Sequence, residues 1–252
     1  MDAPILSVSD LVIEYPRAGK TPFRAVKGVS FDVRDNEFFG IVGESGCGKS
    51  TVAKCLCGLL PAAFGSVVFQ PMSRGAVQMI FQDAVGSLNP RKTIGQALHE
   101  VLTVHRLCPK AAQVERIGRL LDEVGLPSEV IDAYPRELSG GQCQRISIAR
   151  ALAMDPRVLV ADEPVSALDV SVQARVLNLL ADLRAKRNLT ILLISHDLAV
   201  VRTVCDRLIV MNAGEIVERG DAKTVFSAPQ HPYTQRLLAA VPDVSTALSA
   251  TL

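Results

Sequence analysis

Hydrophobic and polar positions alternate along the beginning of the chain. The loose alternation over residues 5–15 predicts a strand that ends at Tyr15, and residues 25–33 predict a second strand. The polar stretch 34–37 is typical of a turn. It leads into the apolar run 38–42, which predicts a third strand.

Helical spacing of apolar residues dominates the middle of the chain. A helix is predicted at 52–60, and short strands are predicted at 67–69 and 77–81. From residue 93 to about 154 the pattern becomes helical. The residues that carry this spacing are Ile94, Leu98, Val101, Leu102, Val114, Ile117, Leu120, Leu121 and Val124.

Continuous apolar runs return in the second half of the chain, at 158–161, 191–194 and 208–211. Such runs are typical of parallel strands that helices cover on both faces. An amphipathic helix predicted at 170–186 lies between the first two. This alternation predicts an α/β fold with a mostly parallel sheet.

The length of 252 residues suits one large α/β domain. We expect a single domain over residues 1–242, with a helical subdomain inserted at about 84–150. The last ten residues, 243–252, offer little to pack, and we expect a flexible tail there.

Charge and cysteine content narrow the class of protein. The formal net charge of +1 gives no reason to expect nucleic acid or an anionic membrane as a partner. No apolar run approaches the roughly 18 residues that cross a bilayer, and the N-terminus lacks a secretory signal pattern. The protein is therefore expected in the cytosol, or on a membrane through another protein. The scattered cysteines (47, 55, 57, 108, 143 and 205) favour free thiols over a metal site.

Residues 43–51 fit the phosphate-binding pattern G-x-x-x-x-G-K-[ST] between a predicted strand and a predicted helix. The candidate residues are Gly43, Glu44, Ser45, Gly46, Cys47, Gly48, Lys49, Ser50 and Thr51. Glycines let backbone N–H groups turn toward a triphosphate. Lys49 is expected to reach the β- and γ-phosphates, and the Ser50 hydroxyl to ligate Mg²⁺. The alternative, a glycine-rich turn with an incidental lysine, does not explain the flanking strand and helix.

Two acidic residues, Asp162 and Glu163, follow the apolar strand predicted at 158–161. In phosphoryl-transfer sites the first such acid holds the metal and the second can polarise the attacking water. The alternative interpretation is an acidic pair at the surface, and the presence of the phosphate loop makes this interpretation weaker.

A second glycine-rich segment precedes the helix predicted from about residue 142 to 154. Its residues are Ser139, Gly140, Gly141 and Gln142. Ser139 can cap the helix, and the glycines leave N–H groups accessible to an anion. Without the phosphate loop, a plain capped helix would be the better interpretation.

Taken together, these motifs resemble the ATP-binding subunits of ABC transporters over residues 6–242. Residues 43–50 resemble Walker A, 138–142 the signature motif and 158–163 Walker B. Four single residues also resemble family motifs. Gln82 corresponds to the Q-loop glutamine and Asp169 to the D-loop aspartate. His196 corresponds to the switch histidine, and Tyr15 to the aromatic residue that stacks on adenine.

The resemblance implies an ATPase with a P-loop core, an N-terminal antiparallel β subdomain and an inserted α-helical subdomain. It implies ATP and Mg²⁺ as cofactors, with Ser50, Gln82 and Asp162 around the metal. Glu163 would polarise water and His196 would contact the γ-phosphate. Residues 139–142 and Asp169 would act across a head-to-tail dimer, since a helical subdomain separates them from the phosphate loop.

Three segments resemble the dipeptide, oligopeptide and nickel importers more narrowly: 86–91, 162–171 and the His-Pro-Tyr-Thr sequence at 231–234. Val165 and Ser166 are similar to the second, F-type, ATPase subunit of these importers. The implied partners are a related ATPase, two membrane-spanning permeases and an extracytoplasmic substrate-binding protein. The implied location is the cytoplasmic face of the plasma (inner) membrane.

Departures from this subfamily leave the substrate open. The segment 65–82 is shorter than usual, Ala84 replaces a frequent proline, and no cysteine-rich extension follows residue 234. Peptides are the expected substrate, with nickel or a metal–metallophore complex as the alternative. The resemblance is also compatible with an accessory ATPase of a cytosolic enzyme complex, such as phosphonate breakdown. A soluble ABC protein of translation or DNA repair is disfavoured, because such proteins usually carry two cassettes, a long coiled-coil insertion, zinc cysteines or basic patches, and the sequence shows none of these.

Overall fold

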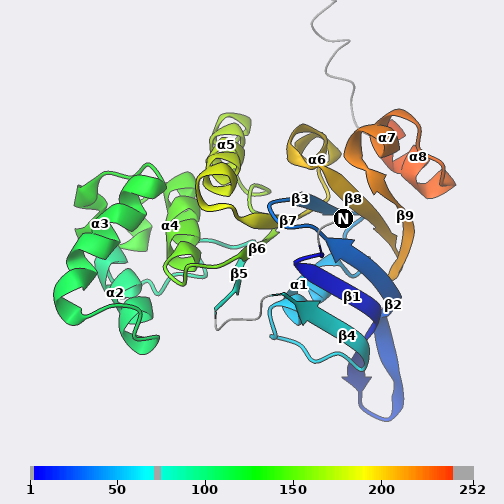
Figure 1. Ribbon diagram of the computed structural model, residues 1–252, viewed down its shortest axis with the longest axis horizontal. Helices are drawn as coiled ribbons and strands as arrows, with labels where there is room; N and C mark the ends of the chain where they lie inside the picture. Colours follow the sequence, from blue (N-terminus) through cyan, green and yellow to red (C-terminus); the bar gives the residue numbers. More distant parts are fainter. Residues whose placement is uncertain (1–2, 71–74, 241–252) are drawn as a thin grey trace, which may run out of the picture.

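A six-stranded sheet forms the centre of the computed structural model, which describes residues 3–70 and 75–240 (Figure 1). The strand order is β5-β6-β7-β3-β8-β9. The strands are β3 (Phe38–Val42), β5 (Val77–Ile80), β6 (Val158–Asp162), β7 (Thr190–Ser195), β8 (Arg207–Asn212) and β9 (Glu215–Asp221). All neighbours are parallel except β8 and β9, so the predicted mostly parallel sheet is confirmed. The tail predicted at 243–252 lies outside the described residues.

The residues of the central strand β3 are apolar without alternation because both faces of the strand are covered. Phe38 and Val42 pack into one hydrophobic cluster, together with α5 (Val170–Arg187) and α6 (Leu198–Val204). Phe39 and Ile41 pack into a second cluster on the opposite face. Because successive side chains of a strand point to opposite faces, both faces require apolar residues.

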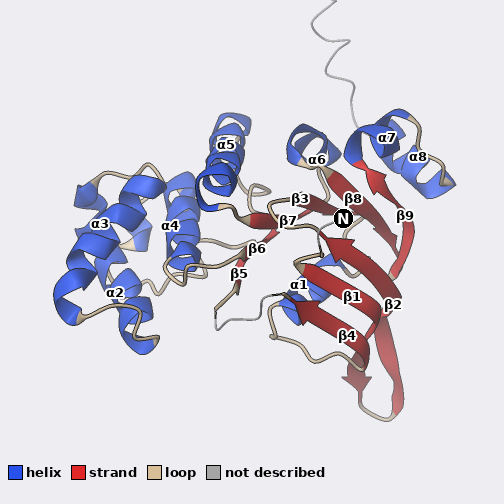
Figure 2. Ribbon diagram, in the orientation of Figure 1, coloured by secondary structure: helices blue, strands red, loops and turns tan. Residues whose placement is uncertain are grey.

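A second, three-stranded antiparallel sheet covers that opposite face, in the order β2-β1-β4 (Figure 2). Its strands are β1 (Leu6–Arg17), β2 (Lys20–Val33) and β4 (Phe64–Phe69). This sheet confirms the N-terminal antiparallel β subdomain. Strand β2 begins five residues before the predicted 25–33, because its first part pairs with the end of β1, as in Tyr15 opposite Phe23.

Helix α1 (Lys49–Leu56) lies between the two sheets, contacting β1 and β2 on one side and β6 and β7 on the other. It is shorter than the predicted 52–60 at its C-terminal end. Gly58 adopts φ 71°, in the left-handed region, two residues after the helix ends. Glycine tolerates this conformation and commonly terminates helices in this way.

A helical segment joins β5 to β6 and projects from that edge of the sheet (Figure 1). It contains α2 (Ile94–Val104), α3 (Gln113–Glu123), α4 (Gly140–Leu152) and short 3₁₀ turns at Lys110–Ala112, Ser128–Asp132 and Pro135–Glu137. The Thr93 hydroxyl accepts the N–H of Gln96, and the Gln96 side chain accepts the N–H of Thr93, which fixes where α2 begins.

The C-terminal part of the described chain contains elements that the sequence pattern did not predict. These are α6, β9, α7 (Ala222–Ser227) and α8 (Pro232–Ala239). Among the described residues, no helix combines the length and apolar character needed to cross a bilayer. All six cysteines are free thiols, and Cys47, Cys55 and Cys143 are buried.

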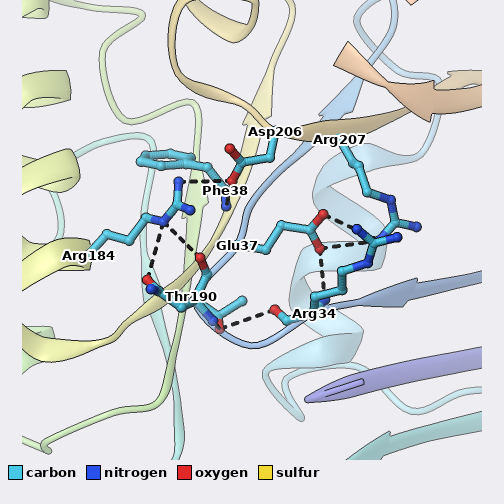
Figure 3. A network of polar contacts seen from close by, with 8 residues as sticks. Arg34, Glu37, Phe38, Arg184, Thr190, Asp206 and Arg207 are labelled. Atoms are coloured by element: carbon cyan, nitrogen blue, oxygen red, sulfur yellow. Dashed lines mark hydrogen bonds and ion pairs between the residues drawn. The ribbon is translucent and has the colours of Figure 1, made fainter. Parts of the chain in front are cut away.

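A polar network holds together the end of the sheet where β3 begins (Figure 3). The buried Glu37 carboxylate accepts the N–H of Arg34 at 2.7 Å and lies 3.3 Å from the Arg207 guanidinium. Burial raises the pKa of Glu37 against the lowering effects of both arginines. Arg184 of α5 pairs with Asp206 at 2.9 Å. These contacts join the turn before β3 to α5 and β8.

Candidate nucleotide site

The loop between β3 and α1 adopts a conformation that its glycines make possible. Gly43, Gly46 and Gly48 have φ of 150°, 80° and 110°, values that side-chain-bearing residues rarely adopt. A Cβ on Gly43 would also overlap the carbonyl oxygen of Met211, and one on Gly48 would lie 2.8 Å from that of Ala25. The predicted loop is therefore present, and it passes close to β2 and β8.

Lys49 lies across the inside of this loop and is 4% exposed. Its ammonium donates to the carbonyl oxygens of Gly43 at 2.7 Å and Glu44 at 2.8 Å. Within the described parts of the chain, Lys49 forms no salt bridge. Its third contact is the Cys47 sulfur at 3.9 Å. A buried cation held by neutral groups favours an anion beside it.

At the start of α1, the Ser50 hydroxyl donates to the Asp162 carboxylate at 2.9 Å. Asp162 is the last residue of β6 and is 4% exposed. Burial raises its pKa, and the Ser50 hydrogen bond acts in the opposite direction. The contact brings two hard oxygen groups together at the mouth of the loop.

Glu163 leaves the sheet immediately after Asp162, with φ 47° in the left-handed region. One carboxylate oxygen lies 3.0 Å from His196 Nδ1, and the other accepts the Gln82 amide at 2.8 Å. Gln82, Glu163 and His196 follow β5, β6 and β7, which are adjacent parallel strands. Their carboxyl ends share one edge of the sheet with the phosphate loop, so these distant residues meet.

These groups surround a cavity of about 640 Å³. The predicted residues on its wall are Tyr15, Gly43, Glu44, Ser45, Gly46, Gly48, Lys49, Ser50, Thr51, Gln82, Glu163 and His196. Cys47 instead packs beneath the loop in the core between the two sheets. Tyr15 is 36% exposed, and its hydroxyl lies 3.3 Å from that of Thr51.

Three residues on this wall were missed by the sequence prediction: Phe23, Ala25 and Leu237. Phe23 lies opposite Tyr15 in the pairing of β1 and β2 and is 47% exposed. Two exposed aromatic rings at the mouth of a polar cavity offer a surface on which a planar group can stack. Extending the predicted second strand by two residues would have included Phe23.

Ser139 caps helix α4 through a reciprocal pair of hydrogen bonds. Its hydroxyl accepts the N–H of Gln142 at 3.3 Å, and its own N–H donates to the Gln142 side chain at 2.9 Å. The predicted cap is confirmed. The phosphate-loop cavity has no lining residue from 139–142, and Gly140 lines a different cavity of about 360 Å³.

Asp169 is the N-terminal cap of α5. Its carboxylate accepts the Ser171 hydroxyl at 2.8 Å and the N–H of Val172 at 3.0 Å. These hydrogen bonds, led by that of Ser171, lower the pKa of Asp169. Like the signature residues, Asp169 lies outside the wall of the phosphate-loop cavity.

The fold, the loop geometry and the acidic pair at the end of β6 define the class: a P-loop nucleoside triphosphatase. Residues 26–166 match the family described as ABC transporter, and residues 217–251 match the family described as oligopeptide/dipeptide transporter, C-terminal region. The first match covers more than half of the chain. The chain therefore belongs to the ABC transporter family, as an ATP-hydrolysing subunit, and the predicted resemblance is confirmed.

Named relatives agree with this assignment. A putative peptide import ATP-binding protein of Brucella ovis is 45% identical over 254 residues, covering 96% of this chain and 80% of the relative. The glutathione import ATP-binding protein GsiA of Pectobacterium atrosepticum is 45% identical over 257 residues. That match covers 95% of this chain but 41% of GsiA.

Solved structures share the fold. The cbiO1 protein of Clostridium perfringens, part of the cbiONQ ABC transporter complex, has a TM-score of 0.79 at 25% identity, covering 98% of this chain and all of that one. The ATP-binding cassette MJ0796, dimeric and bound to ADP and Pi, has a TM-score of 0.75 at 26% identity. The structural match covers 86% of this chain and 98% of the MJ0796 chain.

Proposed function

We propose that this chain hydrolyses ATP to power an importer of peptides. The observation that carries the proposal is the match of residues 217–251 to the C-terminal region of oligopeptide and dipeptide transporters. Relatives named for peptide and glutathione import support the same substrate class.

The phosphate loop is suited to the triphosphate of ATP. Lys49 is already buried against the loop, and its ammonium can exchange its two carbonyl contacts for phosphate oxygens. The loop N–H groups and the N-terminus of α1 add further donors. Tyr15 and Phe23 provide the exposed rings on which the adenine base would stack.

The residues beside the loop fit Mg²⁺, which prefers oxygen ligands. Ser50 and Asp162 already lie within hydrogen-bond distance of each other, and the amide oxygen of Gln82 completes the set of candidate ligands. When bound, the metal would neutralise charge on the transferred phosphoryl group. The Ser50 hydrogen bond keeps the Asp162 carboxylate oriented toward the loop.

Hydrolysis requires a group that orients water, and Glu163 is that group in this proposal. Its two carboxylate oxygens contact Gln82 and His196, so its side chain is held at the cavity wall from both sides. A carboxylate in this position can accept a hydrogen bond from the attacking water. His196 would contact the γ-phosphate from the same side.

A second ATPase subunit would complete the site. Ser139, Gly140 and Gly141 sit at the N-terminus of α4, outside the phosphate-loop cavity, and can therefore donate to a nucleotide held by a facing subunit. The dimeric MJ0796 cassette supports this arrangement. We propose a related but different chain as the partner, in line with the subfamily resemblance, with Asp169 at the interface.

Permease subunits would dock between the core and the helical segment. A cavity of about 290 Å³ lies there, bounded by the segment that follows α1 and by β5, α2 and α4. Its wall includes the exposed apolar side chains of Leu59 and Phe81. A short amphipathic helix from a membrane protein fits a partly apolar groove of this kind. The chain would then lie on the cytoplasmic face of the inner membrane, with a substrate-binding protein on the other side.

The test is purification of the tagged chain from its native membrane, followed by reconstitution in lipid vesicles. We expect two membrane-spanning permeases and a second ATPase to co-purify. A peptide-loaded binding protein should stimulate ATP hydrolysis, and the same assembly carrying Lys49→Ala should not respond. Stimulation by a nickel complex instead of peptides would replace the substrate assignment. Co-purification with cytosolic enzymes and no permease would refute the transport role.

A further inference from the structure

The His-Pro-Tyr-Thr sequence at 231–234 forms a fixed start for helix α8. His231 caps the helix, because its Nδ1 accepts the N–H of Tyr233 at 3.1 Å. Pro232 occupies the first helical position, where its missing N–H has no cost. The Glu218 carboxylate of β9 accepts the N–H groups of Gln230 at 2.8 Å and His231 at 3.1 Å. The helix is thereby tied to the edge strand of the main sheet.

This arrangement places the Tyr233 side chain against the phosphate loop. Tyr233 is 5% exposed, and its hydroxyl accepts the backbone N–H of Glu44 at 3.0 Å. Burial raises its pKa, so the hydroxyl stays neutral at physiological pH. One turn further along α8, Leu237 forms part of the wall of the phosphate-loop cavity.

The peptide group that joins Gly43 to Glu44 is therefore held at both ends. Its carbonyl oxygen accepts the Lys49 ammonium, and its N–H donates to Tyr233. Gly43 lacks a Cβ, so it restricts the orientation of the peptide that follows it less than another residue would. The orientation of the peptide thus depends on groups outside the loop, and Tyr233 is one of them.

We propose that Tyr233 is a positioning residue for the phosphate loop, acting through the Glu44 N–H. The inference rests on the proposed binding of ATP at this loop. Helix α8 then serves as a support that keeps the first peptide of the loop, and with it the Lys49 ammonium, ready for the triphosphate. The alternative role, a buried ring that only fills the core, requires no hydroxyl.

Tyr233→Phe separates the two roles, because it keeps the ring and removes only the hydroxyl. In the full-length chain, we expect faster amide hydrogen exchange in the peptides that cover residues 43–48, without a change elsewhere in the core. ATP binding, measured by calorimetry, should weaken about threefold to tenfold, which corresponds to one hydrogen bond. In the reconstituted transporter the KM for ATP should rise by a similar factor, with kcat at saturating ATP within about twofold of wild type.

Tyr134→Phe is the matched control, since Tyr134 lies in the helical segment and does not line the phosphate-loop cavity. It should bind ATP as the wild type does. A second variant, Glu218→Gln, weakens the attachment of α8 but leaves the Tyr233 hydroxyl in place, and it should raise KM in the same direction. Unchanged exchange and unchanged ATP affinity in Tyr233→Phe would overturn the inference. Failure of the wild type to bind ATP would instead overturn the proposed function.

Discussion

Replacing Glu163 by glutamine tests the catalytic proposal most directly. The two side chains have nearly the same shape, so the substitution preserves the packing of residue 163 beside His196 and Gln82. The amide still offers one oxygen to the Gln82 side chain, whose contact is 2.8 Å long in the wild type. What the variant loses is the second carboxylate oxygen and the ability to take a proton.

The loss can be expressed as an activation energy. General-base groups contribute about 10²–10⁴-fold to rate, which corresponds to about 3–5 kcal/mol. Mg·ATP affinity should stay the same or increase, because one negative charge disappears next to Asp162, whose pKa Glu163 helps to raise. ATP should therefore hold the two ATPase subunits closed for longer.

The assay is phosphate release by the reconstituted transporter at saturating Mg·ATP, with calorimetry for binding. Glu115→Gln is a suitable control, because Glu115 is an exposed residue of α3 whose carboxylate pairs with the exposed Arg119. It should hydrolyse ATP at the wild-type rate. Turnover of Glu163→Gln within tenfold of wild type would remove Glu163 from the catalytic role.

Three further predictions follow from the site. Lys49→Ala should weaken ATP binding by about tenfold or more, since it removes a charged donor; unchanged affinity by calorimetry would contradict the loop assignment. Gly43→Ala should lower the free energy of unfolding by more than about 3 kcal/mol in urea titrations, because strain adds to the overlap with Met211. Its control Gly58→Ala, with open space around the added Cβ, should lose about 1–2 kcal/mol, and equal losses would refute the overlap argument. Asp162→Asn should raise Tm at pH 7 without nucleotide but reduce the stabilisation by Mg·ATP. A folded-state pKa raised by burial means that the wild type loses stability as pH rises through that pKa, so the difference should vanish below about pH 4. A pH-independent difference would contradict this reasoning.

Much of the site could be predicted because its residues follow sequence signals that are local. The phosphate loop needs only a strand, glycines and a helix in succession, and all of these are adjacent in the chain. Glu163 and His196 follow continuous apolar runs, and parallel strands bring their carboxyl ends together. Ser139 was predictable as a cap because capping depends on residues within one helical turn.

The elements that escaped prediction lack a strong periodic pattern. Strand β9 lies at the sheet edge and is only partly buried, so no continuous apolar run marks it. Helices α6, α7 and α8 are too short to display a helical period over several turns. The contact between Tyr233 and Glu44 joins residues 189 positions apart, and nothing in the local sequence indicates it.

The position of β3 in the sheet also has a consequence during synthesis of the chain. Its two neighbours, β7 and β8, come from the second half of the sequence, with Phe38 pairing with Ile191 and Phe39 with Arg207. While the ribosome is still translating the segments between, both edges of this hydrophobic strand lack their partners. Unpaired apolar strands of this kind are prone to intermolecular association. Nascent chains that stop before residue 190 should therefore depend on chaperones to remain unaggregated.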